Sequence, residues 1–427
     1  MSSAKLSNTK DTISTPTSEN LLTALIKRIE ESSANLEKGK FTYIIGNNGS
    51  GKSRALSALS EILHGNSKFP LVACIASSIH DRFNYESTGN IRYMGARNIS
   101  NAVFISSIER DLTGYILQAM LIKRGAFKTL CNSVGLEISF SLDQRSIRYL
   151  QLDYKPKTRN AMRLRKKAEE LNLITARSIS VLNRIANEKT SFDQLTAAQI
   201  AKLKDYVDAN IDINLEIKDL QGRSMGFDGL STGEQNRLLM LAKILSAMKE
   251  HTVFLIDEPE LSLHLHWQME FHSTLLKILS SLKNYHVVIA THSPIMISEA
   301  VRADRTLDNV VVVLGIKTIE KMKSFSTEEN QIIPLRFYSF VDVASHEQLV
   351  LRQFHTSPYQ TREVSVEITN TVLNYAEGTI EKSAALASLE ELTIAEGLSQ
   401  ESEIQIRAAI AFVRKGLTKS IKDTISK

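Results

Sequence analysis

Apolar residues near the start of the chain recur at helical spacing and then give way to a continuous apolar run. From Leu21 to Leu36, most apolar positions fall three or four residues apart, as on one face of a helix. A Lys-Gly-Lys turn at 38–40 separates this helix from the run Phe41 to Ile45. The pattern predicts a helix, a turn and a buried strand.

Three further short apolar runs lie far downstream, and each is bounded by polar or turn residues. Helical patterns lie between the earlier of these runs. Short all-apolar strands that alternate with helices are typical of a parallel sheet covered on both faces. The sequence therefore predicts an α/β fold. The three runs are Val253 to Ile256, Val287 to Ala290 and Val310 to Leu314.

Two long segments lack this strand pattern. Residues 99–206 carry long helical stretches with charged faces, which predicts an inserted helical arm. Residues 321–427 also favour helices, for example Ser383 to Thr393 and Ser402 to Leu417, and predict a C-terminal helical region. We thus expect a tail at 1–20, a first α/β part at 21–98, the arm at 99–206, a second α/β part at 207–320 and the helical region at 321–427.

The composition is that of an ordinary globular protein, with 427 residues of which 43% are hydrophobic and 23% charged. Cys74 and Cys131 are too few for a disulfide framework and have no zinc-site spacing, which favours a reducing compartment. The polar residues 1–20 predict a disordered tail without the apolar core of a signal peptide. No apolar run is long enough to span a bilayer. We expect a cytoplasmic protein with no membrane partner.

The segment GNNGSGKS directly after the first strand fits the phosphate-binding pattern G-x-x-x-x-G-K-[ST], and an apolar helical pattern follows it. In this context the glycines let backbone amides turn toward phosphate oxygens, Lys52 offsets the charge of the β- and γ-phosphates, and the Ser53 hydroxyl can bind Mg²⁺. ATP with Mg²⁺ is the expected cofactor. The residues expected to bind it here are Gly46, Asn47, Asn48, Gly49, Ser50, Gly51, Lys52 and Ser53.

Two carboxylates follow the apolar run at 253–256. Asp257, at the carboxyl end of a buried strand, can hold Mg²⁺ directly or through water. Glu258 points to where a water would attack the γ-phosphate. Adjacent residues of a strand face opposite sides, which suits two different roles.

Three further motifs resemble those of ABC-type ATPases. The segment LSTGEQ at 230–235 resembles the LSGGEQ signature. The segment PELSLH at 259–264 is similar to the D-loop of the SMC/RecF/OLD-like branch, and ATHSP at 290–294 is similar to the switch-histidine loop of that branch. Their order fits the resemblance, and the distances between them leave room for one helix and one strand in each step.

The resemblance implies a P-loop ATPase head that hydrolyses ATP as a homodimer or higher oligomer. Each ATP would lie between the P-loop of one subunit and the signature of the other, where Ser231, Gly233 and Glu234 open a helix whose positive end faces the γ-phosphate. His292 would contact the γ-phosphate and orient the water, so Glu258 and His292 are the expected catalytic residues. Ser231 also fits an ordinary helix N-cap, and the two roles are compatible.

Related ATPases present a glutamine on a loop after an early strand, where it touches Mg²⁺. The stretch from Tyr93 to Asn98 contains no glutamine. Arg97, Asn98 or the more distant Gln118 are alternatives for this role, and the sequence does not decide between them.

Seven basic residues lie in the arm with no acidic residue among them. Such a block is suited to a nucleic-acid backbone or to an acidic protein partner. A solvated basic helix face is the alternative. The residues are Lys155, Lys157, Arg159, Arg163, Arg165, Lys166 and Lys167.

The chain resembles the stand-alone ATPase subunits of bacterial antiphage systems of the Septu, retron-associated or PARIS type, because no Toprim nuclease pattern follows the switch loop. The resemblance implies an ATPase that senses a trigger and controls a separately encoded effector, namely a nuclease. A RecF-like DNA-repair ATPase that binds DNA ends or gaps is the alternative. A transporter subunit and an ATP-gated scaffold with little turnover are less favoured.

Overall fold

The computed structural model describes most of the two α/β parts, the arm and the C-terminal helices. The described residues are 18–34, 39–46, 49–78, 80–84, 86–95, 105–142, 147–187, 190–211, 213–261, 263–304, 306, 308–314, 335–340, 361–393, 398 and 400–416. Residues 1–17 of the expected tail lie outside them, while residues 18–20 form the start of a helix, α1 (Ser18–Ala34).

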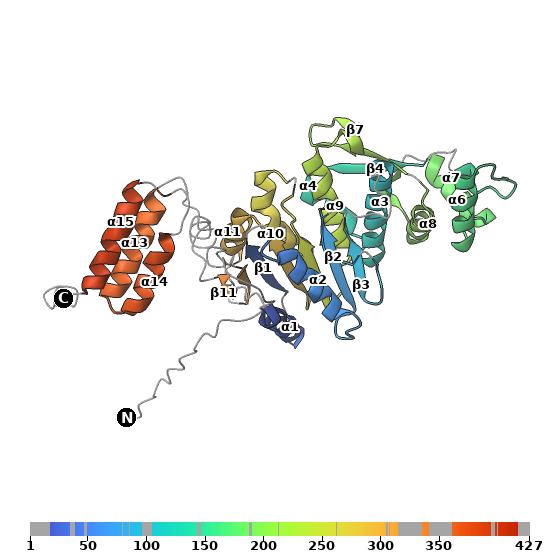
Figure 1. The fold of residues 1–427 in the computed structure, drawn as a ribbon. Helices are drawn as coiled ribbons and strands as arrows, with labels where there is room; N and C mark the ends of the chain where they lie inside the picture. Colours follow the sequence, from blue (N-terminus) through green and yellow to red (C-terminus); the bar gives the residue numbers. More distant parts are fainter. Residues whose placement is uncertain are drawn as a thin grey trace, which may run out of the picture.

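The main sheet is formed within the described residues by seven strands in the order β11-β10-β1-β9-β8-β2-β3 (Figure 1). All neighbours are parallel except β11, which pairs antiparallel with β10 at one edge. This mixed sheet confirms the predicted α/β P-loop fold. Its strands are β1 (Lys40–Gly46), β2 (Leu71–Ala76), β3 (Ile91–Met94), β8 (Thr252–Asp257), β9 (His286–Thr291), β10 (Val310–Leu314) and β11 (Leu335–Ser339).

Helices cover both faces of this sheet. Because alternate residues of a strand face opposite sides, Tyr43 packs in one hydrophobic core and Ile44 in the other. The core around Ile44 includes α1 and α2 (Lys52–Leu63). The larger core around Tyr43 includes α3 (Ile105–Ile122), α9 (Thr232–Ser246), α10 (Leu265–Leu279) and α11 (Pro294–Ala303), and it continues into the helices of the arm.

The region expected as a helical arm is largely helical but also contributes to a second sheet. Its strands pair antiparallel in the order β5-β4-β6-β7. These are β4 (Glu137–Ser141), β5 (Thr190–Ser191), β6 (Asn214–Lys218) and β7 (Ser224–Gly226). Besides α3, the helices of this region are α4 (Ala126–Val134), α6 (Arg159–Glu170), α7 (Ala176–Asn187) and α8 (Ala197–Asp208), with a short 3₁₀ turn η1 (Phe192–Gln194). A second 3₁₀ turn, η2 (Phe227–Gly229), follows β7.

The C-terminal region is helical, as expected, apart from the edge strand β11, which lies inside the range expected as helices. Its helices are α13 (Thr361–Ala376), α14 (Lys382–Leu392) and α15 (Gln400–Lys415). They enclose a hydrophobic core of their own around Val364, Leu389 and Ile406. None of the helices in the described parts of the chain has the length and apolar character needed to cross a membrane.

Candidate functional site

The described residues of the P-loop, the two carboxylates and the switch histidine come together where three neighbouring parallel strands end. Ile45 of β1 lies beside Thr291 of β9, and Ala290 of β9 lies beside Asp257 of β8. The P-loop, the two carboxylates and the switch histidine each follow one of these strands. The carboxyl edge of a parallel sheet is the usual place for a ligand in an α/β fold.

The P-loop has the backbone shape that its glycines allow. Gly49 and Gly51 have φ angles of 81° and 96°, a conformation in which other residues are strained. A Cβ atom at Gly46 would lie 2.7 Å from the Leu314 carbonyl oxygen, so this position also needs glycine. Asn47 and Asn48 lie outside the described residues.

Two features of the loop fit a bound phosphate. Gly51, the N-cap of α2, provides no side-chain cap, and a helix N-terminus of this kind can receive an anion. Ser50 is buried, and among the described residues its hydroxyl oxygen has no hydrogen-bond partner. A buried polar atom without a partner is costly unless a ligand supplies one.

Lys52 is 4% exposed and is held by protein atoms. Its Nζ donates to the Gly46 carbonyl at 2.9 Å and lies 3.1 Å from Nδ1 of His292. Burial lowers its pKa, while the charges of Glu258, Glu260 and Asp257 act to raise it. Lys52 is therefore a desolvated cation placed to bind phosphate oxygens.

The predicted Mg²⁺ ligands are in contact, since the Ser53 hydroxyl donates to Oδ1 of Asp257 at 3.1 Å. Burial is the main cause that raises the pKa of Asp257 to about 7, and the charges of Glu258 and Asp81 add to it. One carboxylate and one hydroxyl fit Mg²⁺, which takes few protein ligands and completes its shell with water and phosphates.

Glu258 and His292 form a direct pair. His292 Nε2 lies 2.8 Å from Oε1 of Glu258. A single tautomer satisfies both ring contacts, with Nε2–H donating to Glu258 and Nδ1 accepting from Lys52. Glu258 has a φ of 47°, and its amide still donates to the Ala290 carbonyl at 2.9 Å, so the chain turns sharply just past the strand ladder.

Glu260 also belongs to this site, although the sequence assigned it no role. Its carboxylate accepts from the backbone amide of His292, and burial raises its pKa. It therefore ties the D-loop to the switch loop. The PELSLH segment that contains Glu260 was the available signal, but the residue to which it bonds is apparent only in three dimensions.

The signature residues open α9. The Ser231 hydroxyl lies 2.7 Å from Oε2 of Glu234, and the Glu234 amide donates back to the Ser231 oxygen at 3.3 Å. This is the capping box that the sequence allowed. Ser231 is exposed, Gly233 lies in the first turn, and no hydrogen bond of the described residues joins them to the P-loop.

The seven basic residues of the arm fall into two groups, two that bond to other parts of the protein and five that are exposed. Arg165 donates to the carbonyl oxygens of Gln151 at 2.9 Å and Tyr154 at 2.8 Å, and Lys167 donates to Asn210 at 3.1 Å. These two side chains therefore hold the arm together. The other five, Lys155, Lys157, Arg159, Arg163 and Lys166, are exposed.

Arg97, Asn98 and Gln118 are the alternatives for the glutamine that related ATPases place near Mg²⁺, and the structure describes only the last of them. Arg97 and Asn98 lie outside the described residues. Gln118 lies on α3, partly buried among the helices, and no hydrogen bond of the described residues joins it to the P-loop or to Asp257.

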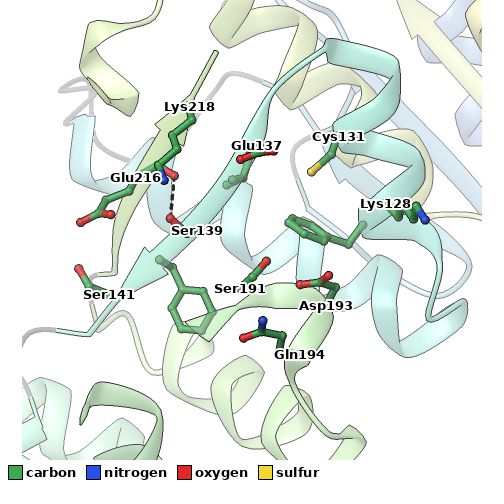
Figure 2. Close-up of a pocket in the computed structure, with 13 residues that line it drawn as sticks. Lys128, Cys131, Glu137, Ser139, Ser141, Ser191, Asp193, Gln194, Glu216 and Lys218 are labelled. Carbon is green, nitrogen blue, oxygen red and sulfur yellow. Dashed lines mark hydrogen bonds between the residues drawn. The ribbon is translucent and has the colours of Figure 1, made fainter. Parts of the chain in front are cut away.

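A cavity of about 620 Å³ lies away from the P-loop, on the second sheet. Figure 2 shows it between α4, β4 and the β5–η1 segment, with Lys128, Glu137, Asp193 and Lys218 around it. None of the predicted site residues lines it.

Comparison with known proteins supports the ATPase assignment. A family model described as an AAA ATPase domain matches residues 132–297, a span that contains the signature, both carboxylates, the D-loop and the switch histidine but not the P-loop. The matched span is similar to an ATPase domain. ATP hydrolysis is the activity that this match implies, and P-loop ATPases typically use ATP with Mg²⁺.

No curated protein matches the chain. Among solved structures, the chain is similar to a crystal structure of the Smc head domain with an extended coiled coil, bound to the C-terminal domain of ScpA, from Pyrococcus furiosus. The identity is 13%, the match covers 71% of this chain and 91% of that one, and the TM-score is 0.29. The likeness is distant.

We expect Lys52→Ala and Glu258→Gln to fail at different steps. Lys52→Ala removes the buried cation that faces the phosphates, so ATP binding should be lost. Glu258→Gln keeps a polar partner for His292 but removes the base, so ATP should bind while hydrolysis falls by about 10²- to 10⁴-fold. Binding of a fluorescent ATP analogue and phosphate release measure the two steps separately. Equal binding and wild-type turnover in both variants would refute the assignment.

Proposed function

We propose that this chain hydrolyses ATP between two copies of itself in the cytoplasm and so controls a separately encoded effector. The observation that carries the ATPase part is the polar cluster at the strand ends, where Lys52 contacts His292, His292 contacts Glu258, and Ser53 contacts Asp257. In this proposal Lys52, Ser53 and Asp257 hold MgATP, and Glu258 activates the water that His292 orients.

The dimer part is supported by the position of the signature. Ser231 is exposed at the start of α9 and has its hydrogen bonds with Glu234 rather than with its own P-loop. A helix N-terminus that is open to solvent can receive an anion from another molecule. Each pocket would then be completed by the signature of the partner subunit.

The effector part rests on the motif resemblance alone. The signature, D-loop and switch loop resemble those of antiphage ATPases that act with a separate protein, for which we propose a nuclease. ATP turnover by the dimer would hold or release this effector when a phage trigger appears.

A RecF-like role at DNA ends or gaps is a second candidate, favoured by the charge of the arm. Residues 147–187 contain ten basic and three acidic residues, whereas the whole chain has a net charge of only +5. Arg159, Arg163 and Lys166 fall at i, i+4 and i+7 on the exposed face of α6, opposite the buried Ala161 and Ala168. Such a stripe suits a phosphate backbone.

The composite site predicts complementation between two inactive variants. Lys52→Ala lacks the phosphate cradle, and Ser231→Arg places a bulky side chain where the γ-phosphate would dock. A mixed dimer still contains one intact pocket, formed by the P-loop of the Ser231→Arg subunit and the signature of the Lys52→Ala subunit. Part of the ATPase activity should therefore return on mixing.

Light scattering of Glu258→Gln with and without ATP is the parallel measurement, because strict coupling of the two pockets would mask complementation. If mixing restores no activity, and if ATP causes no association at any protein concentration, the proposed composite site is wrong.

The effector proposal predicts phage restriction that depends on nucleotide. Cells that express this chain with the product of an adjacent gene should plate phage less efficiently than cells that express either protein alone. The same pair with Lys52→Ala should lose this protection, because the ATP-bound state cannot form. Equal plating by all four strains would contradict a defence role, and would leave the ATPase assignment to be judged by phosphate release.

The basic arm predicts binding that responds to salt. Neutralising Lys155, Lys157, Arg163 and Lys166 with glutamine should weaken binding to a DNA duplex and reduce the slope of log K against log[salt] by roughly 3 to 4, while basal ATPase is kept. Fluorescence anisotropy over a salt series measures this. A control with the exposed lysines Lys249, Lys277 and Lys283 changed to glutamine should bind like the wild type.

Binding of an acidic peptide instead of DNA, lost in the same arm variant, would assign the arm to a protein partner. Unchanged binding of both probes would identify the arm as a solvated face.

A further inference from the structure

A buried lysine lies in the last turn of α9, the helix that the signature residues open. Lys243 is 7% exposed, and its Nζ donates to the carbonyl oxygen of Ala76 at 3.3 Å. The carboxylates whose charges act on it are Asp111 of α3 and Asp81 of the loop after β2. Burial lowers the pKa of Lys243 to about 8. An ammonium group is costly to bury, and leucine or methionine would fill the same space without that cost.

The two ends of α9 face different surroundings. Ser231, the N-cap, is exposed at one end, and Lys243 is buried twelve residues further along, which is about 18 Å of helix. A helix of this length moves as one body because its backbone hydrogen bonds are internal. A displacement at Ser231 is therefore carried to Lys243.

The C-terminal end of α9 is hydrogen-bonded to β2 and β3, the two strands that follow β8 at one edge of the main sheet. Besides the Lys243 contact, the Ser246 carbonyl accepts from the Arg92 guanidinium of β3 at 3.0 Å. Ala76, which accepts from Lys243, is the last residue of β2 and pairs in register with Asp257. Lys243 is therefore hydrogen-bonded to the end of β2, directly beside the predicted Mg²⁺ ligand Asp257.

Asp81 extends this connection. It is 4% exposed, and its two carboxylate oxygens accept from the Phe83 amide at 3.1 Å and the Tyr93 hydroxyl at 2.9 Å. Its charge acts both on Lys243 and on Asp257. The Asp81 carboxylate is thus held in place by two hydrogen bonds and lies close enough to both groups for its charge to act on them.

We propose that Lys243 is a positioning residue that couples the signature of one subunit to the hydrolytic centre of the same subunit. When Ser231 binds the ATP held by the partner, α9 shifts, and Lys243 adjusts the β2 end and the Asp81 loop beside Asp257. The two ATP sites of a dimer thereby report to each other. This inference rests on the proposed composite site.

The test replaces Lys243 with methionine, which has a similar length but neither charge nor donor. We expect Lys243→Met to bind MgATP and to associate with ATP, in a Glu258→Gln background, as the parent does. Its kcat should fall on the order of tenfold, with KM little changed, and the cooperativity of ATP hydrolysis should be lost. Its melting temperature should not fall, because a buried charge has been replaced by an apolar side chain.

Two further variants make the result decisive. In Asp81→Asn the amide oxygen can still accept from the Phe83 amide, and the amide nitrogen can donate to the Tyr93 hydroxyl oxygen, but the charge is removed. This variant should therefore lose cooperativity as well, and it carries the test if Lys243→Met does not fold. Lys249→Met changes an exposed lysine just beyond α9 and should behave as the wild type.

Wild-type kcat and cooperativity in Lys243→Met and Asp81→Asn would overturn the inference. A parallel fall in melting temperature and kcat, with cooperativity kept, would reduce Lys243 to a packing residue and overturn it too. If the wild type hydrolyses ATP without any ATP-dependent association, the composite site itself fails, and the coupling fails with it.

Discussion

The parallel pairing of β1, β9 and β8 is the constraint on which the site depends. Three segments meet at the carboxyl ends of these strands, namely the P-loop, the carboxylate pair and the switch histidine. They are far apart in the chain because each follows a different strand. The register, with Ile45 beside Thr291 and Ala290 beside Asp257, brings their ends to one edge. A slip of one residue would turn each strand-end side chain to the other face. The amide of Glu258 extends the ladder by one bond before the chain turns.

This edge gathers charges that are costly to desolvate. Burial lowers the pKa of Lys52 and raises those of Asp257 and Glu260, so the protein alone disfavours the charged form of each. The contacts with Gly46, His292 and Ser53 offset only part of that cost. Mg²⁺ would supply positive charge beside Asp257, and phosphates would supply negative charge beside Lys52. The site is therefore built to be completed by its ligand.

The sequence revealed what depends on local pattern. The P-loop and the all-apolar strands β1, β8, β9 and β10 are continuous signals, and the structure confirms the α/β P-loop fold that they predicted. The pattern did not predict β2 or β3, although β2 has six residues like β8 and β9, and it did not predict β11, which joins the edge by pairing with β10. It also gave no role to Glu260 or Lys243, because their partners lie 32 and 167 positions away in the chain. Such contacts arise from topology, which no local spacing encodes.

The start of α9 shows why a signature can act as a switch rather than as a fixed cradle. The carboxylate of Glu234 lies 2.7 Å from the Ser231 hydroxyl, where it occupies the position in which a γ-phosphate from a partner would accept the same hydrogen bond. Two anions would not share that position, because like charges at hydrogen-bond distance repel each other. Under the proposed composite site, Glu234 would turn away as phosphate binds, and the helix would exchange one N-terminal anion for another. This exchange would take place in the first turn of the same helix that buries Lys243, so the proposed coupling between the two sites would run through α9.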